Sequence, residues 1–90
     1  MKEDLINKII ESIKATKYEE AEKTIAELFA LNMESTKPHL FLGIIWELKK
    51  DKPHALRHYR AALAMDGTDQ VALYNLYRVG DNTKTPIRFE

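Results

Sequence analysis

The chain has 90 residues, with 14 Lys or Arg balanced by 14 Asp or Glu, and its 44% hydrophobic and 31% charged content is typical of one globular domain. A protein that binds mainly phosphate groups carries a basic excess, so the formal net charge of zero argues against nucleic acid as the partner. The lack of cysteine excludes disulfides, a thiolate nucleophile and thiolate-bound zinc.

Apolar residues recur at three- and four-residue steps from the start of the chain, and no stretch alternates long enough to predict a strand. The sequence therefore predicts an all-α fold. A first helix covers about residues 2–15 and a second about residues 18–32, with acidic side chains in the first turn of the second, where the helix dipole favours them. The first helix carries one apolar stripe, formed by Leu5, Ile6, Ile9, Ile10 and Ile13.

Polar capping residues mark the starts of the next two helices. Ser35 or Thr36 is expected to cap a third helix of about residues 37–50, and Asp51 is expected to cap a fourth of about residues 52–65. Each of these helices has a proline in its first turn, where the missing N–H has no intrahelical acceptor.

The last part of the chain contains one more predicted helix and a tail. The fifth helix covers about residues 69–79 and is expected to end at Gly80. Residues 81–90 show no helical period, so we expect a tail that is extended or disordered. Ile87 and Phe89 are the residues through which this tail could dock locally.

The sequence repeats with a period of 34 residues. A shift of this length places Ala21 on Ala55 and Ala30 on Ala64. The middle unit carries the clearest pattern of small and aromatic residues, which consists of Leu42, Gly43, Trp46, Ala55, Tyr59 and Ala62. A 34-residue helix–turn–helix unit with this pattern resembles the tetratricopeptide repeat family, although His39 and Gly67 stand where the family usually has tryptophan and proline.

The resemblance implies antiparallel helical hairpins stacked as a short right-handed superhelix, with two repeats and a C-terminal capping helix. The implied organisation is one domain over residues 1–80, with repeats at about 2–34 and 36–67, a capping helix at about 69–79 and a tail at 81–90. Each hairpin of such a fold buries its apolar face against a neighbour, so this is a small array. Its small size favours a partner, self-association or origin from a longer repeat protein.

The resemblance also implies that the first helix of each hairpin lines a concave groove. The groove residues in this sequence are Ile6, Ile10, Ile13, Lys37, Leu40, Phe41, Ile44, Leu48, Tyr74 and Arg78, with Glu47 and Asn75 on the same wall. Because this wall is largely apolar, it suits an amphipathic helix or an extended segment of a partner protein. The alternative is that Leu40, Ile44 and Leu48 are core residues, covered by the fifth helix or the tail.

Members of the family that hold the acidic carboxyl-terminal segment of a chaperone share a clamp of lysine, asparagine and arginine. This sequence has Ile6, Ile10, Phe41 and Val71 where that clamp would lie. Capture of a terminal carboxylate is therefore disfavoured. Tyr74 is expected to project toward the groove, where its hydroxyl could bind a ligand.

The sequence offers little catalytic or metal-binding chemistry. His54 and His58 are four residues apart on the fourth helix, with Asp51 nearby, which is a spacing that two metal ligands can have. The pair lacks the adjacent glutamate of a metalloprotease and lies on the face expected to be solvated. Because no serine lies in a glycine-rich elbow and no glycine loop could hold phosphate, we expect no enzyme activity, no metal and no cofactor.

The remaining aromatic residues are expected to serve packing. Trp46, Tyr59 and Tyr77 occupy positions that pack between helices in the family. His39 is expected to be a partly buried packing residue on the third helix.

These features predict a non-enzymatic protein interaction module, such as an adaptor, scaffold or small chaperone. The alternative is a homodimer that buries the apolar groove or an end helix. Residues 1–34 carry eight acidic and five basic residues, whereas residues 35–79 carry four and seven. This asymmetry is explained by solvated helix faces, by attraction between opposite ends of two copies, or by contact with an acidic partner. The longest apolar run, Leu40 to Trp46, is too short to span a membrane, and the acidic N-terminus differs from a secretory signal, so we expect a cytoplasmic protein without a membrane partner.

Overall fold

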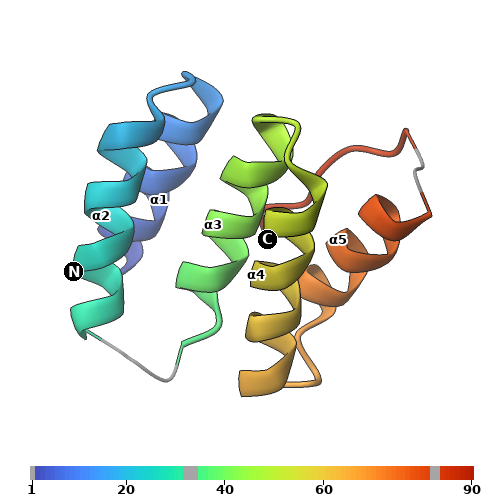
Figure 1. Ribbon diagram of the computed structural model, residues 1–90. Helices are drawn as coiled ribbons and strands as arrows, with labels where there is room; N and C mark the ends of the chain where they lie inside the picture. Colours follow the sequence, from blue (N-terminus) through green and yellow to red (C-terminus); the bar gives the residue numbers. More distant parts are fainter. Residues whose placement is uncertain (1, 32–34, 82–83) are drawn as a thin grey trace.

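The computed structural model describes residues 2–31, 35–81 and 84–90, and five helices form most of this part of the chain (Figure 1). They are α1 (Lys2–Lys14), α2 (Tyr18–Leu31), α3 (Lys37–Leu48), α4 (Lys52–Met65) and α5 (Gln70–Gly80). No strand occurs among the described residues, so the expected all-α fold is confirmed. The expected ends of the second helix and of the first repeat, at residues 32–34, lie outside the described residues, as do residue 1 and residues 82–83 of the tail.

Side-chain caps begin three of the helices. The carboxylate of Asp51 accepts a hydrogen bond from the N–H of His54 (3.1 Å), and that of Asp69 accepts from the second and third following N–H groups, both at 3.0 Å. Thr36 stands at the start of α3 but makes no capping bond, because its hydroxyl donates to the carboxylate of Asp69. Of the two expected caps of α3, only Ser35 accepts from a helix N–H, at 3.2 Å.

The α1–α2 and α3–α4 turns end their first helices in the same way. Thr16 and Lys50 take positive φ angles of 60° and 66°, at positions separated by the period of the sequence. The residue after each of them donates its N–H to a carbonyl in the last turn of the helix, that of Ser12 (2.8 Å) or Trp46 (2.9 Å). The sequence period is thus repeated in the backbone geometry of the two turns.

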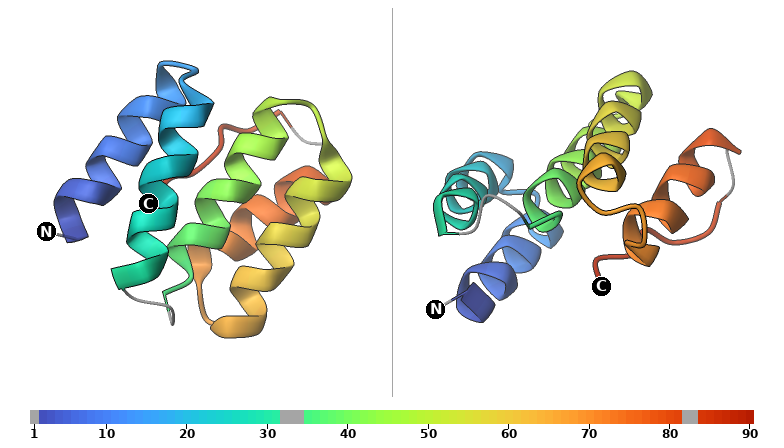
Figure 2. Two further views of the ribbon diagram at one scale, coloured as in Figure 1. Left: turned by 60° about the vertical axis from the view of Figure 1, so that its left-hand side comes forward. Right: turned by 90° about the horizontal axis from the view of Figure 1, so that it is seen from below.

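The helices pack in two antiparallel pairs followed by a single helix. α1 lies beside α2, α3 lies beside α4, and α5 packs against α4, while α2 contacts α3 and so joins the two pairs (Figures 1 and 2). One core runs through all five helices. Its largest fully buried apolar and aromatic side chains are Ile9, Ile13, Leu28, Leu40, Phe41, Ile44, Ile45 and Tyr59.

The packing expected of the aromatic residues holds at three positions and fails at one. Tyr59 is fully buried, and Trp46 and His39 are half-buried. Tyr77 is 62% exposed, so the expectation that it packs between helices is wrong. The reason is its place on α5: among the described residues, no helix follows α5 to cover its outer face.

The tail is extended over residues 84–90 and returns across the molecule from the end of α5 (Figures 1 and 2). Ile87 and Phe89, the two residues through which the sequence allowed the tail to dock, are half-buried against the core. Phe89 reaches α1, where the Nζ atom of Lys14 lies 5.2 Å from its ring centroid. The tail therefore spans the surface between α5 and α1.

Candidate functional site

The candidate site is the surface on which the tail lies. Most of its side chains come from α1, α3 and α5. Thr16 of the α1–α2 turn and Tyr18 at the start of α2 also line the hollow that holds Ile87 and Phe89. We call this surface the tail-binding face, and it consists of Ile13, Lys14, Thr16, Tyr18, Leu48, Tyr74, Asn75 and Arg78. Four of these residues, Ile13, Leu48, Tyr74 and Arg78, are among those that the repeat pattern predicted to line a groove.

Asn75 holds the backbone of the tail from the middle of α5. Its side chain is fully buried, and both ends of its amide bond to Arg88. The Nδ2 atom donates to the carbonyl of Arg88 (2.9 Å), and the N–H of Arg88 donates to the Oδ1 atom (3.1 Å). This pair of bonds resembles the bonds that one strand makes to its neighbour, and it gives both polar atoms of the buried amide a partner.

Two further side chains of α5 bond to tail carbonyls. The hydroxyl of Tyr74 donates to the carbonyl of Pro86 (3.0 Å), and Nη1 of Arg78 donates to the carbonyl of Thr85 (3.3 Å). Together with the two bonds of Asn75, four hydrogen bonds fix the tail through its main chain. None of them depends on which side chain the tail residue carries.

The side chains of the tail alternate between the protein and the solvent. Ile87 and Phe89 pack against the core, whereas Arg88 between them is exposed, which is the alternation of an extended chain. The guanidinium carbon of Arg88 lies 5.5 Å from the ring centroid of Tyr74, and the ammonium of Lys14 lies 5.2 Å from that of Phe89. Both are cation–π contacts.

A buried ion pair connects the tail-binding face to the core. The Nη2 atom of Arg78 bonds to the carboxylate of Glu47 on α3, and the hydroxyl of Tyr59 on α4 donates to the same carboxylate (2.8 Å). The Arg78 side chain is 7% exposed and that of Glu47 is 15% exposed. Burial is the main cause that raises the pKa of the Tyr59 phenol, and the negative charge of Glu47 adds to it, so the hydroxyl stays a donor.

The residues predicted to line a groove fall into three groups in the structure. Ile13, Leu48, Tyr74 and Arg78 lie at the tail. Leu40, Phe41 and Ile44 are fully buried core residues and do not line an open surface, which is the alternative that the sequence left open for Leu40 and Ile44. Ile6, Ile10 and Lys37 are half-buried, and Ile6 and Lys37 line a separate hollow between the start of α1 and the start of α3.

The tail was the part of the site that the sequence could not place. Asn75 was on the expected groove wall, but its partner, the backbone of Arg88, carries no sequence signal. The alternation of Ile87 and Phe89 was the one usable signal, since it is the pattern of an extended segment with one buried side.

One of the three histidines, His39, lies on α3, and the other two lie on α4. The Nδ1 atoms of His39 and His58 are 3.3 Å apart, and Phe29 of α2 contacts His39 edge-on at 6.1 Å between ring centroids. His54 instead stacks on Trp46 at 4.3 Å. His54 and His58 therefore have different partners, and the described residues contain no group of three or more His, Cys, Asp or Glu that could hold a metal.

We expect the stability of the protein to fall as the pH decreases below about 6.5. Burial, followed by the charges of His39, His54 and Arg57, lowers the pKa of His58 below its ordinary value of 6.5. Between these two pKa values the unfolded chain binds a proton that the folded chain does not, so the free energy of unfolding decreases with falling pH. The stabilising contribution of neutral His58 is fully present above the ordinary pKa of 6.5. It is lost as the pH falls toward the lower pKa of the folded state, and below that pKa it no longer changes.

Urea denaturation of the wild type and of His58→Gln between pH 5 and 7.5 tests this expectation. The wild type should lose stability on acidification, and the variant should lose less, because glutamine does not titrate. An equal decrease in both proteins would contradict the role of His58.

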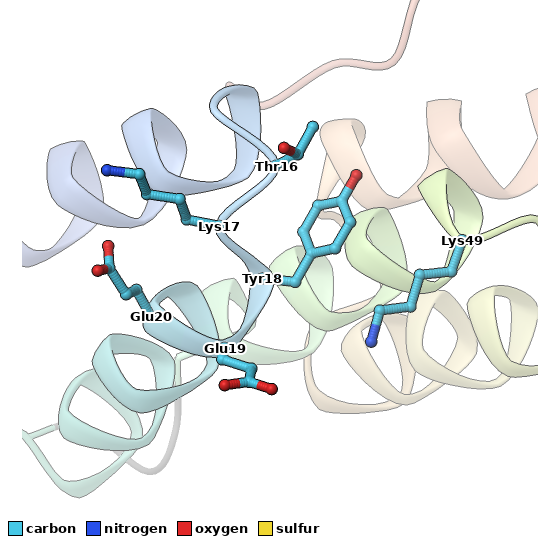
Figure 3. Close-up of a pocket in the computed structure, with 6 residues that line it drawn as sticks. All are labelled: Thr16, Lys17, Tyr18, Glu19, Glu20 and Lys49. Carbon is cyan, nitrogen blue, oxygen red and sulfur yellow. The ribbon is translucent and has the colours of Figure 1, made fainter.

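A hollow of about 510 Å³ lies at the α1–α2 turn beside the end of α3 (Figure 3). The ammonium of Lys49 lies over the rings of Tyr18 (5.7 Å) and Trp46 (5.2 Å). The rim of this hollow carries both Lys and Glu side chains, as Figure 3 shows, so the hollow favours neither sign of ligand charge. The residues that line it are Thr16, Lys17, Tyr18, Glu19, Glu20 and Lys49.

Comparisons with known proteins found no relative of this chain. No protein-family model matched the sequence, and neither the curated proteins nor the solved structures gave a match. None of the described helices is both long enough and apolar enough to cross a bilayer.

Proposed function

We propose that this protein is a non-enzymatic interaction module that binds an extended segment of a partner protein on the tail-binding face. The observation that carries the proposal is the tail itself, which lies on this face as an extended chain held by four main-chain hydrogen bonds. A surface that holds one extended segment through its backbone can hold another of different sequence. The module would act as an adaptor, a scaffold or a small chaperone.

The geometry favours an extended segment over an amphipathic helix as the occupant. The amide of Asn75 needs a neighbouring N–H and C=O that are both available, and the hydroxyl of Tyr74 needs an available carbonyl. In the interior of a helix these backbone groups bond to one another, whereas an extended chain presents them to its neighbours. A bound helix would leave the buried Asn75 amide without partners, which is unfavourable.

We also propose a tetratricopeptide-like arrangement for the two helix pairs and α5. The like turns at Thr16 and Lys50 support it, since each ends the first helix of a pair at equivalent positions of the 34-residue period. In such an arrangement the first helices of successive pairs face one side. The contribution of α1, α3 and α5 to most of the tail-binding face supports the proposal, although Thr16 and Tyr18 of the α1–α2 turn and α2 also line it.

The test begins by clearing the face in the full-length chain. Ile87→Asp with Phe89→Asp places two charges where the tail is half-buried, so the tail should leave the surface while the five helices remain. We call this protein the tail-cleared variant. Random peptides displayed on phage are selected on it, and their affinities are measured by fluorescence anisotropy.

The matched control adds Asn75→Ala to the tail-cleared variant. Loss of two main-chain hydrogen bonds of about 1 kcal/mol each should weaken the selected peptides by about tenfold or more. Circular dichroism verifies that both proteins stay helical. Peptides that bind both proteins equally, or a selection that enriches none, would contradict the proposed function.

A further inference from the structure

The tail makes three kinds of contact that together define one register on the protein. Its backbone is paired at Arg88 with Asn75, its apolar side chains at positions 87 and 89 face the core, and its aromatic ring meets Lys14. A shift by one residue would turn Ile87 and Phe89 toward solvent. The tail is thus seated as a ligand would be, with a defined position for each residue.

We infer that residues 84–90 are an intramolecular ligand of the tail-binding face, and that partner segments share their pattern, an aliphatic residue and an aromatic residue on either side of a basic one. The inference rests on the proposed function and adds two properties to it. It names the chemistry of the partner segment, and it states that a partner must displace the tail before it can bind.

Each position of the pattern has its own contact. The aliphatic position, that of Ile87, packs against the core beside Leu48 and Ile13. The basic position, that of Arg88, lies over the ring of Tyr74. An aromatic ring is favoured over an aliphatic side chain at the position of Phe89, because the ammonium of Lys14 is attracted to the face of a ring.

Covalent attachment makes the tail a strong competitor. A segment joined to its own binding site by a short connection acts at an effective concentration in the millimolar range. A partner segment with the same intrinsic affinity therefore binds more weakly in solution. Its apparent association constant is the intrinsic constant multiplied by the fraction of molecules in which the tail has left the face. Weakening the tail raises that fraction without changing the face.

The experiment uses a fluorescein-labelled peptide with the sequence of residues 84–90, Lys-Thr-Pro-Ile-Arg-Phe-Glu. Its affinity is measured by anisotropy for the full-length wild type and for the full-length tail-cleared variant. We expect binding to the tail-cleared variant to be at least tenfold tighter. Adding Asn75→Ala to that variant should weaken binding about tenfold, and a scrambled peptide in which Ile and Phe are adjacent should bind neither protein.

A second measurement shows directly where the tail lies in the wild type. The side-chain amide resonances of Asn75 in a heteronuclear NMR spectrum should shift between the wild type and the tail-cleared variant, because both amide atoms lose their bonds to Arg88. Adding the tail peptide to the tail-cleared variant should restore them. An unchanged Asn75 resonance would overturn the inference.

The outcomes separate this inference from the proposed function. Equal affinity of the tail peptide for both proteins would overturn the competition, and the face would still bind peptides. Failure of the tail peptide to bind the tail-cleared variant, which does bind phage-selected peptides through Asn75, would overturn the shared pattern alone. A wild-type dimer that dissociates on clearing the tail, seen by light scattering, would show that the tail occupies a second copy and would overturn the intramolecular assignment.

Discussion

Replacing Arg78 with methionine is expected to lower the free energy of unfolding by about 3–5 kcal/mol. The guanidinium is almost fully buried and bonds to Glu47, which is itself mostly buried and fixed by the hydroxyl of Tyr59. Removing the positive charge leaves a carboxylate with little access to water and no counter-charge. Urea denaturation at pH 7, followed by helical circular dichroism, measures the loss.

The control for this variant also removes the negative charge of Glu47, which Arg78→Met leaves without its partner. Adding Glu47→Gln to Arg78→Met keeps an acceptor for the Tyr59 hydroxyl and should recover about 1 kcal/mol or more of the lost stability. If the double variant is less stable than Arg78→Met alone, the stranded carboxylate is not the cause of the loss. A loss below about 1 kcal/mol for Arg78→Met would show that the pair behaves as a surface ion pair.

Arg78 also joins the stability of the fold to the binding of the tail. The same guanidinium bonds to Glu47 on α3 and to the tail carbonyl of Thr85. α5 is packed mainly against α4, so this residue is one of its links to α3. An Arg78 variant therefore changes both properties, whereas the tail-cleared variant keeps the ion pair and changes the tail alone.

The helices were predictable because their signals are local. Apolar spacing, first-turn prolines and the aspartate before α4 gave all five helices with small errors at their ends. The largest error, two residues at the end of α3, arose at Lys50, which adopts the left-handed conformation normally taken by glycine. A lysine carries no signal for that conformation, so the earlier end of α3 could not be anticipated.

The site was predictable only in part because half of it is backbone. The repeat pattern placed Tyr74, Asn75 and Arg78 on one face of the last helix, and the structure has all three there. Their partners are carbonyl and N–H groups of the tail, which every residue possesses. The prediction that Tyr77 packs between helices was wrong for a related reason, since its burial would depend on a following helix and not on its local sequence.

Gly43→Ala is expected to destabilise the protein by about 1–3 kcal/mol. A Cβ atom at this position would lie 2.5 Å from Cε1 of the fully buried Tyr59, about 1 Å inside an ordinary carbon–carbon contact. Overpacking of this kind costs about 1–3 kcal/mol, and moving the ring also breaks the bond from its hydroxyl to Glu47, worth about 1 kcal/mol. The better helix propensity of alanine offsets about 1 kcal/mol of this loss.

Gly80→Ala is the matched control for Gly43→Ala. An added Cβ at Gly80 meets no heavy atom within 4 Å, so only the propensity term acts, and stability should stay the same or rise by up to about 1 kcal/mol. Urea denaturation should therefore show a lower free energy of unfolding for Gly43→Ala and an equal or higher one for Gly80→Ala. Repeating Gly43→Ala in a Tyr59→Leu background tests whether the tyrosine ring is the cause. If the substitution is as destabilising there as in the wild type, the contact with the ring is not what requires glycine. The close approach of α3 and α4 must then depend on another contact.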